Sequence, residues 1–306
     1  MAVLFSHKHS RIVAIIIALA VLPAFSALCP AQAEARGVIV VKSVDLKPYQ
    51  EVLRGFKDTC GCPVGEMQIR DREDREKILL RSPDAIVAIG TSVFKQVRDI
   101  KDIPVIYTMA MPSETSPSRQ PNISGVSMDI SPVAYLDAMR ELFSRVKRIG
   151  ILYDPQNTGA YVEDAAQAAK AAGIELVTKQ VHDASKIPAA LDELQGKIDV
   201  LWMLPDPAVA TDETVELLLR FSFQHAVPVF SFAKKYVEMG AVASLDVDPY
   251  DMGVQAAEIL SKVSAGHAGA IRVYARKSHL SINRNVAAKM GLKIKEEALK
   301  KVKGYE

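Results

Sequence analysis

The sequence predicts an α/β fold in two lobes, each lobe a mostly parallel sheet flanked by helices. The length of 306 residues favours about two domains of ordinary size. From Gly37 onward, short β-branched runs alternate with helix-length amphipathic stretches, as in βαβ units. Most of the short runs are continuously apolar, which is expected when helices cover both faces of a parallel sheet.

The apolar runs predict the strands, and the stretches between them predict the helices. The predicted strands are Val38–Lys42, Ala85–Ile89, Val105–Tyr107, Ile149–Tyr153, Val200–Met203, Val227–Phe230 and Ala241–Ser244. The predicted helices include Thr91–Ile100, Ser131–Arg145, Tyr161–Ala172, Asp212–Gln224 and Asp251–Ala265. In the second of these helices the apolar residues keep helical spacing, and Pro132 lies in the first turn, where a missing N–H costs nothing.

The alternation pauses once, across Met111–Ile123, which holds three prolines and four Ser/Thr residues. Such a segment suits either a linker between lobes or a long surface loop inside one domain. Because a new strand–helix series begins directly after it, we predict that the chain first crosses between the lobes here.

The N-terminus has the pattern of a secretory signal peptide. Lys8 and Arg11 precede the apolar run Ile12–Leu22, and Ala31–Ala33 (AQA) forms an A-x-A cleavage site. A membrane anchor is the alternative, but the run of eleven apolar residues is shorter than the ~20 that a spanning helix needs. We therefore expect residues 1–35 to be removed, with cleavage after residue 33 or 35, and the mature protein to be periplasmic.

Charge and cysteine content exclude several classes of function. The 38 Lys+Arg and 36 Asp+Glu residues give a net charge of +2, so neither a nucleic acid nor a polyanionic substrate is expected. Cleavage of the signal peptide leaves Cys60 and Cys62 as the cysteines of the mature chain. No second Cys pair and no nearby His completes a metal site, so a local disulfide or two idle thiols is expected instead.

Polar residues follow the predicted strands, and in open α/β sheets ligands bind beyond the carboxyl ends of strands. The resulting candidate ligand-binding residues are Ser43, Asp45, Gly90, Thr91, Ser92, Thr108, Met109, Asn157, Thr158, Asp206, Ser231 and Asp246. They include hydroxyls, an amide and a few carboxylates but no nucleophile–base pair. The sequence also lacks GxGxxG, GxSxG, HExxH and Walker motifs. We expect no catalytic residue, no metal and no cofactor, and hence a binding protein rather than an enzyme.

Two of these positions allow both a binding role and a structural role. Gly90, Thr91 and Ser92 can place a ligand carboxylate at a helix N-terminus, or simply cap that helix in a tight turn. Asp206, between two prolines, can hold a ligand ammonium or begin a helix. Trp202, on the preceding strand, is expected in the core.

The ordered set of segments resembles the ABC transporter substrate-binding protein family, in the type I periplasmic-binding-protein branch whose characterised relatives bind aromatic amino acids such as tryptophan. The segments that carry the resemblance are Ala88–Thr91, Asn122–Ser127, Val146–Asn157, Val227–Phe230, Met239–Ala241, Asp248–Leu260 with Gly253, Ser281–Asn283, Ala287 and Gly291–Leu292.

The resemblance implies a clamshell that closes on a small organic solute and delivers it, as a monomer, to ABC permease subunits in the inner membrane. It also implies that residues 36–128 and 248–276 form lobe one, and residues 129–247 and 277–306 form lobe two. One departure is Met111-Pro112, where many members have Asp-Pro. This leaves open a ligand other than an ordinary amino acid, with Met109 and Met111 as an apolar, adaptable wall.

Two other functions compete with transport. The same fold serves periplasmic sensing proteins that dock on a signalling partner, so the sequence does not separate sensing from transport. A periplasmic α/β enzyme is disfavoured because no catalytic constellation is present.

Overall fold

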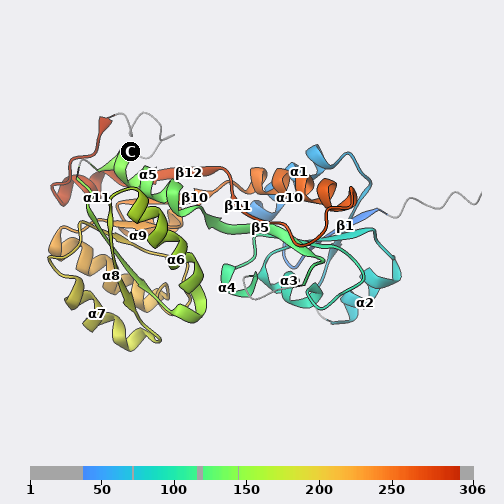
Figure 1. Cartoon of the computed structure of the whole chain (residues 1–306), viewed down its shortest axis with the longest axis horizontal. Coiled ribbons are helices and arrows are strands. Elements are labelled where there is room, and N and C mark those ends of the chain that lie inside the picture. Colours follow the sequence, from blue (N-terminus) through green and yellow to red (C-terminus); the bar gives the residue numbers. More distant parts are fainter. Residues whose placement is uncertain (1–36, 71, 116–119, 144, 297–306) are drawn as a thin grey trace, which may run out of the picture. The chain divides into compact units, whose positions relative to one another are not determined.

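The computed structural model describes residues 37–70, 72–115, 120–143 and 145–296. The predicted signal peptide lies outside the described residues. Two six-stranded sheets and the helices around them make up the described chain (Figure 1). No helix in these described ranges is both long enough and apolar enough to cross a membrane.

The first sheet has the strand order β11-β5-β4-β3-β1-β2, and every pair in it is parallel. Its strands are β1 (Val38–Lys42), β2 (Val64–Gln68), β3 (Ala85–Ile89), β4 (Val105–Thr108), β5 (Ile123–Ile130) and β11 (Arg272–Ala275). The central strands β3 and β4 are buried along their whole length, which agrees with their continuous apolar runs.

The second sheet repeats this arrangement in the order β12-β10-β9-β8-β6-β7. Its strands are β6 (Arg148–Tyr153), β7 (Glu175–Gln180), β8 (Val200–Trp202), β9 (Val229–Ser231), β10 (Ala243–Val247) and β12 (Ser278–Ile282). Among the described strands only β12 is antiparallel to its neighbour. The predicted fold class, two α/β lobes with mostly parallel sheets, is confirmed.

The helices connect the strands and cover the sheets. They are α1 (Lys47–Cys60), α2 (Arg72–Leu80), α3 (Thr91–Val97), α4 (Pro112–Thr115), α5 (Pro132–Leu142), α6 (Pro155–Ala171), α7 (Ile187–Leu194), α8 (Asp212–His225), α9 (Lys234–Met239), α10 (Pro249–Ser264) and α11 (Arg284–Lys289), with a 3-10 turn at Ala184–Lys186. Ser131 caps α5 with Pro132 in the first turn, as predicted, and Asp248 caps α10.

The predicted strands all form, but five others were not predicted. Strands β2 and β7 lie at sheet edges and are only partly buried, so they lack a continuous apolar run. Strand β11 is likewise mostly unburied, and in β12 three polar residues leave no continuous apolar run. Strand β5 was missed because serine, glycine and aspartate interrupt its apolar residues.

The prediction that the chain first crosses between lobes at Met111–Ile123 is wrong. Strand β5, which follows this segment, pairs in parallel with β4 and therefore still belongs to the first sheet. The segment is a connection inside the first lobe, and the chain leaves the first sheet only after Ile130. The lobe boundaries near residues 128, 248 and 276 stay a prediction, and β5 runs continuously through the first of them.

Helix α10 follows a strand of the second sheet but packs on α1, beside the first sheet (Figure 1). Two glycines permit the close approach of these helices. A Cβ atom on Gly55 would lie 2.1 Å from the carbonyl oxygen of Tyr250, and one on Gly253 would lie 2.0 Å from that of Val52. Both positions therefore need a residue without a side chain.

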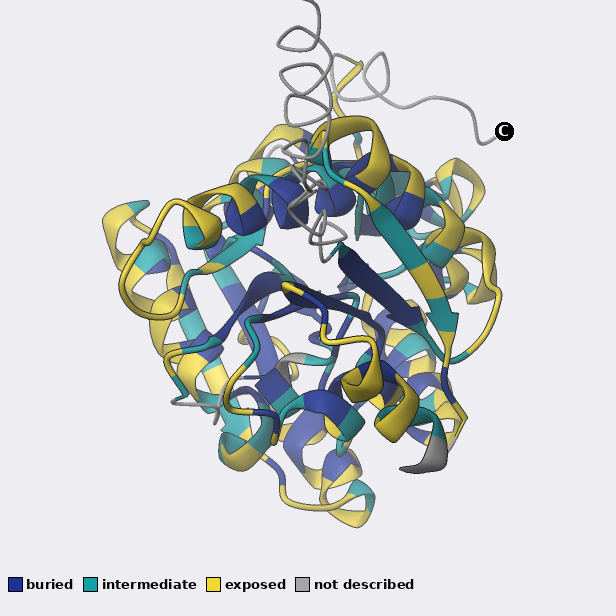
Figure 2. Cartoon of the chain, turned by 90° about the vertical axis from the view of Figure 1, so that its right-hand side faces the viewer, coloured by how far each residue is buried: buried dark blue, intermediate teal, exposed yellow. Residues whose placement is uncertain are grey.

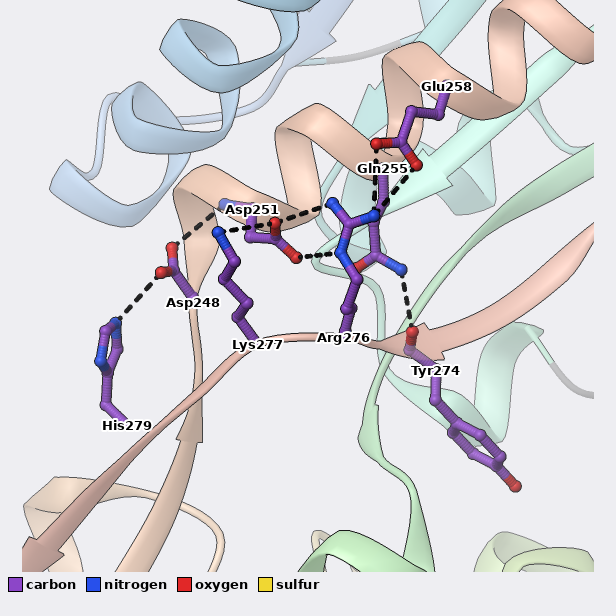
Figure 3. Close-up of polar contacts among 8 residues, drawn as sticks. All are labelled: Asp248, Asp251, Gln255, Glu258, Tyr274, Arg276, Lys277 and His279. Carbon is purple, nitrogen blue, oxygen red and sulfur yellow. Dashed lines mark hydrogen bonds and ion pairs between the residues drawn. The ribbon is translucent and has the colours of Figure 1, made fainter. Parts of the chain in front are cut away.

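The connection from β11 to β12 is tied to α10 by side chains (Figure 3). Arg276 donates to both carboxylate oxygens of the buried Asp251, at 2.8 and 3.2 Å, and also to Glu258. Gln255 donates to the carbonyl oxygen of Tyr274 and accepts from the N–H of Arg276. The charge-assisted bidentate pair makes this one of the stronger polar contacts between segments distant in the sequence.

Buried residues concentrate in the strands and on the inward faces of the helices, and exposed residues on their outer faces (Figure 2). Trp202 on β8 is completely buried, as predicted. Cys60 and Cys62 form a disulfide between the end of α1 and the start of the connection to β2, with their Cα atoms 5.2 Å apart. Of the two expected alternatives, a local disulfide or two idle thiols, the structure shows the disulfide.

Candidate functional site

A cavity of about 50 Å³ lies beside the carboxyl end of β5. Its wall is apolar and aromatic, with a single carboxylate. The lining residues are Met111, Met128, Asp129, Ile130, Tyr135, Tyr161, Leu204, Pro205, Phe232 and Val247. They come from the ends of β5 and β10, from α5 and α6, and from the loops after β4, β8 and β9. Strand ends of both sheets therefore contribute, as expected for a binding site of this fold.

Asp129 is the charged group of this cavity. It is half-buried, and its Oδ2 accepts a hydrogen bond of 2.9 Å from Ser127 Oγ, whereas no described residue donates to Oδ1. Burial raises the pKa of Asp129 to about 6, and the Ser127 hydrogen bond only partly opposes this. A carboxylate with a perturbed pKa in a cavity marks a candidate functional residue.

Tyrosines, rather than cations, surround Asp129. Its charge contributes to the raised pKa values of Tyr107 on β4, Tyr135 on α5, Tyr161 on α6 and Tyr274 on β11, in each case together with a larger effect of burial. No described Lys, Arg or His pairs with it. The negative charge is therefore available to a positively charged ligand.

The aromatic wall of the cavity is held rigid by packing and by hydrogen bonds. The ring centroids of Tyr135 and Tyr161 lie 4.8 and 5.9 Å from that of Trp202. The Tyr135 hydroxyl donates to the carbonyl oxygen of Leu245 at 3.2 Å, and that of Tyr161 donates to the carbonyl oxygen of Ile130 at 2.8 Å. Both hydroxyl protons are thus already used within the protein.

Sequence reasoning missed Asp129 because it missed β5. The candidate residues follow predicted strands, and no predicted strand ends beside Asp129. The polar end of the segment Ser127-Met128-Asp129, directly before the Ser131-Pro132 helix start, was the signal that could have indicated it.

The predicted segment Gly90–Ser92 lies next to this cavity through Thr91. Thr91 Oγ1 accepts a hydrogen bond of 2.9 Å from the N–H of Met111, whose side chain lines the cavity. Gly90 occupies the N-cap position of α3, and no side chain bonds there, so of the two alternatives left open by the sequence, a side-chain cap by Thr91 or Ser92 does not form. Ser92 is exposed.

Thr108 ends β4, and Met109 follows it toward the same region. Met109 has a φ of 54°, a left-handed conformation that is uncommon for a residue with a side chain. Thr108 is completely buried, and its Oγ1 lacks a hydrogen-bond partner in the described structure. Such strain and unsatisfied polar atoms gather at binding sites more often than elsewhere.

Asp206 is part of a buried polar network and does not face the cavity. It is completely buried, and it accepts hydrogen bonds from the N–H groups of Asp154 and Ala208, from Asn157 Nδ2, and from Thr158 Oγ1. Both carboxylate oxygens are therefore used in holding the start of α6 to the turn after β8. We leave Asp206, Asn157 and Thr158 out of the proposed site, because Asn157 and Thr158 already donate to Asp206, whose carboxylate oxygens are both occupied. Helix α8 begins later, with Thr211 as its cap, so Asp206 does not begin a helix either.

The remaining predicted residues are also engaged within the protein. Asp45 is exposed and pairs with Lys42 at 2.9 Å, which lowers its pKa, and the carbonyl oxygen of Ser43 accepts from Gln68. Ser231 is buried and donates to the carbonyl oxygen of Ala243. Asp246 accepts from the N–H of Lys234 and from Ser244 Oγ at 2.6 Å each, and burial raises its pKa.

The described residues hold no group of three or more His, Cys, Asp or Glu side chains placed to bind a metal ion. The chemistry available at the cavity is therefore that of one carboxylate against aromatic rings and thioethers. Such a set of groups suits the capture of a small molecule with a cationic head and an apolar body.

A family model described as "ABC transporter substrate binding protein" matches residues 72–304. The chain belongs to this family. Membership confirms the resemblance seen in the sequence. It also confirms the expectation of a substrate-binding protein rather than an enzyme.

A relative in Clostridioides difficile, the "Tyrosine-binding protein", is 27% identical over 199 residues. The match covers 62% of this chain and 57% of that protein, so the chain spans little more than half the length of this curated relative.

Two solved structures share the fold. A ligand-free, open substrate-binding protein with adhesive properties from Clostridium difficile is 19% identical, with a TM-score of 0.65 over 84% of this chain and 95% of that chain. An ABC domain from Streptococcus pneumoniae in complex with L-Trp is 22% identical, with a TM-score of 0.57 over 87% of this chain and 98% of that chain. At these identities the likeness shows the fold alone.

Proposed function

We propose that the chain is the exported substrate-binding protein of an ABC importer, and that it binds a small organic solute with an ammonium group and an aromatic or apolar body. The observation that carries this proposal is Asp129, a half-buried carboxylate without a cationic partner in an aromatic wall. A ligand ammonium would complete an ion pair there, and an aromatic body would pack against Tyr135, Tyr161 and Phe232.

The cavity must enlarge to accept such a ligand. Its 50 Å³ suffices for ordered water but not for an amino acid. Met111 and Met128 line it and are only half-buried, so their flexible side chains can move aside. The cavity can also accept the ligand if the ligand enters while the lobes are apart and the lobes then close around it.

The polar groups beside Met111 complete the proposed site. Thr91 positions Met111 through its hydroxyl, and Gly90, Ser92, Thr108 and Met109 lie around it at the ends of β3 and β4. Because relatives bind tyrosine or are solved with L-Trp, aromatic amino acids and their derivatives are the first ligands to examine.

The proposed export and partners follow from the N-terminal pattern and the family. We expect the mature protein to begin at Glu34 or Arg36, to reside in the periplasm as a monomer, and to deliver its ligand to permease subunits of the inner membrane. N-terminal sequencing of periplasmic protein tests this, and recovery of intact Met1 in the membrane fraction would contradict it.

The ligand itself is best identified by native mass spectrometry of protein purified from the periplasm. We expect a small organic cation or zwitterion that is lost from the Asp129→Asn variant and retained by the wild type. Retention of the same molecule by both proteins would show that Asp129 does not hold it.

A further inference from the structure

The cavity offers hydrogen-bond acceptors but almost no donors. The Asp129 carboxylate and the methionine thioethers accept hydrogen bonds and do not donate. The Tyr135 and Tyr161 hydroxyls can accept, but each already donates to a backbone carbonyl oxygen. None of the described lining residues is Lys, Arg or His. The wall therefore complements a cation and provides no partner for an anion.

The lining residues offer no free donor to the carboxylate of an amino acid, so that group would depend on the hydroxyls at the ends of β3 and β4. Thr91 Oγ1 accepts from the Met111 N–H, and its remaining proton, like that of the unpartnered Thr108 hydroxyl, can provide only a neutral hydrogen bond. Ser92 is exposed to solvent, and α3 has only seven residues. A carboxylate at this position would lose hydration without gaining a charged partner, and it would lie on the same side of the ligand as the negative charge of Asp129.

We propose that the cavity selects aromatic monoamines, such as tyramine and tryptamine, over the corresponding amino acids. This inference rests on the proposed function, because it concerns the ligand class of the same site. An amine forms one ion pair with Asp129 and packs its ring against the tyrosines, so the one charged group of the ligand is paired. The amino acid makes the same contacts but adds an anion that the wall does not satisfy.

The experiment compares three ligands that share one ring. Isothermal titration calorimetry at pH 7.5 is carried out on the mature protein with tyramine, tyrosine and 3-(4-hydroxyphenyl)propionate. The first carries only an ammonium, the second both charged groups, and the third only a carboxylate. We expect tyramine to bind at least about tenfold more tightly than tyrosine, a difference of about 1.4 kcal/mol, and the propionate not to bind.

A second readout locates the ligand. Trp202 is the one tryptophan of the chain, and its ring packs on both cavity tyrosines, so its emission, excited at 295 nm, should change when tyramine binds. Asp129→Asn should abolish most of this binding. Asp183→Asn removes the same charge from an exposed residue outside the cavity and should leave binding unchanged.

The outcomes separate this inference from the proposed function. Binding of tyrosine as tight as that of tyramine, or tighter, would overturn the amine preference while supporting a solute-binding role. Binding of tyramine that leaves Trp202 emission unaltered and tolerates Asp129→Asn would place the ligand elsewhere and overturn the inference. If none of tyramine, tyrosine, tryptamine and tryptophan binds, both the inference and the proposal of an aromatic ligand for this cavity are wrong.

Discussion

Replacing Asp129 with asparagine should make the ligand-free protein more stable while it weakens ligand binding. The two effects have one cause. The carboxylate is held half-buried without a cation, which raises its pKa, so its ionised form opposes folding. Asparagine keeps the size and the hydrogen bond from Ser127 but carries no charge. A residue that serves binding at the expense of stability should behave in this way.

The magnitude follows from the pKa. A pKa raised from 3.8 to about 6 corresponds to about 3 kcal/mol at most, and we expect about 1–3 kcal/mol because Asp129 is only half-buried. The pKa of Asp129 is higher in the folded state than in the unfolded state, so the free energy of unfolding of the wild type falls by this amount as the pH rises from about 4 to about 6. The free energy of unfolding of the variant should therefore exceed that of the wild type at pH 7 and equal it near pH 4.

Urea unfolding of the ligand-free proteins at pH 4 and pH 7 measures both differences. Asp251→Asn is the matched control of opposite sign. Although burial opposes the effect, the Arg276 hydrogen bond and charge lower the pKa of Asp251, so this carboxylate stabilises the fold above its pKa. Asp251→Asn should lower the free energy of unfolding at pH 7. An Asp129→Asn variant that is no more stable than the wild type at pH 7 would refute the account of an unpaired carboxylate.

Four further substitutions test the packing, the polar network and the proposed site. Gly253→Ala should lower the free energy of unfolding by about 1–3 kcal/mol, because its Cβ would lie 2.0 Å from the Val52 carbonyl oxygen. Gly159→Ala on α6 is the control: its Cβ would lie 3.7 Å from the nearest neighbour, so the free energy of unfolding should rise by about 0.5–1 kcal/mol. If urea unfolding shows the same change for both glycine variants, the close packing of α1 on α10 is contradicted. Asp206→Ala should lower the free energy of unfolding by about 3–5 kcal/mol, because it leaves four hydrogen-bond donors unpaired, those of Asp154, Asn157, Thr158 and Ala208. Near-native thermal stability of this variant would show that the donors find other partners. Thr91→Val removes the acceptor for the Met111 N–H, so calorimetry should show ligand binding weakened about tenfold, with little change in the melting temperature. Unchanged affinity would show that Thr91 is not part of the site.

The proposed site lies at the strand ends that the sequence indicated, but its carboxylate is Asp129 rather than Asp206. Asp129 lies at the end of β5 and Asp206 follows β8, and composition does not distinguish them. Their difference arises from contacts: Asp206 receives four hydrogen bonds from residues up to 52 positions away, whereas Asp129 receives a side-chain hydrogen bond only from Ser127, two positions away. Whether a carboxylate is satisfied depends on partners brought by the fold, which no local pattern records.

The sequence by itself determined the fold class, because continuous apolar runs such as Ala85–Ile89 are stable only between two layers of helices. It also determined the family, through short segments spread along the chain. Only the tertiary structure decided that β5 still belongs to the first sheet, since its pairing with β4 depends on distant hydrogen bonds rather than on its interrupted apolar pattern. That same pairing carries Asp129 to the cavity among Tyr135, Tyr161 and Phe232. The physical reason is one and the same: burial patterns are local and can be read along the chain, whereas the partner of each strand and of each charge is chosen by residues far away in the sequence.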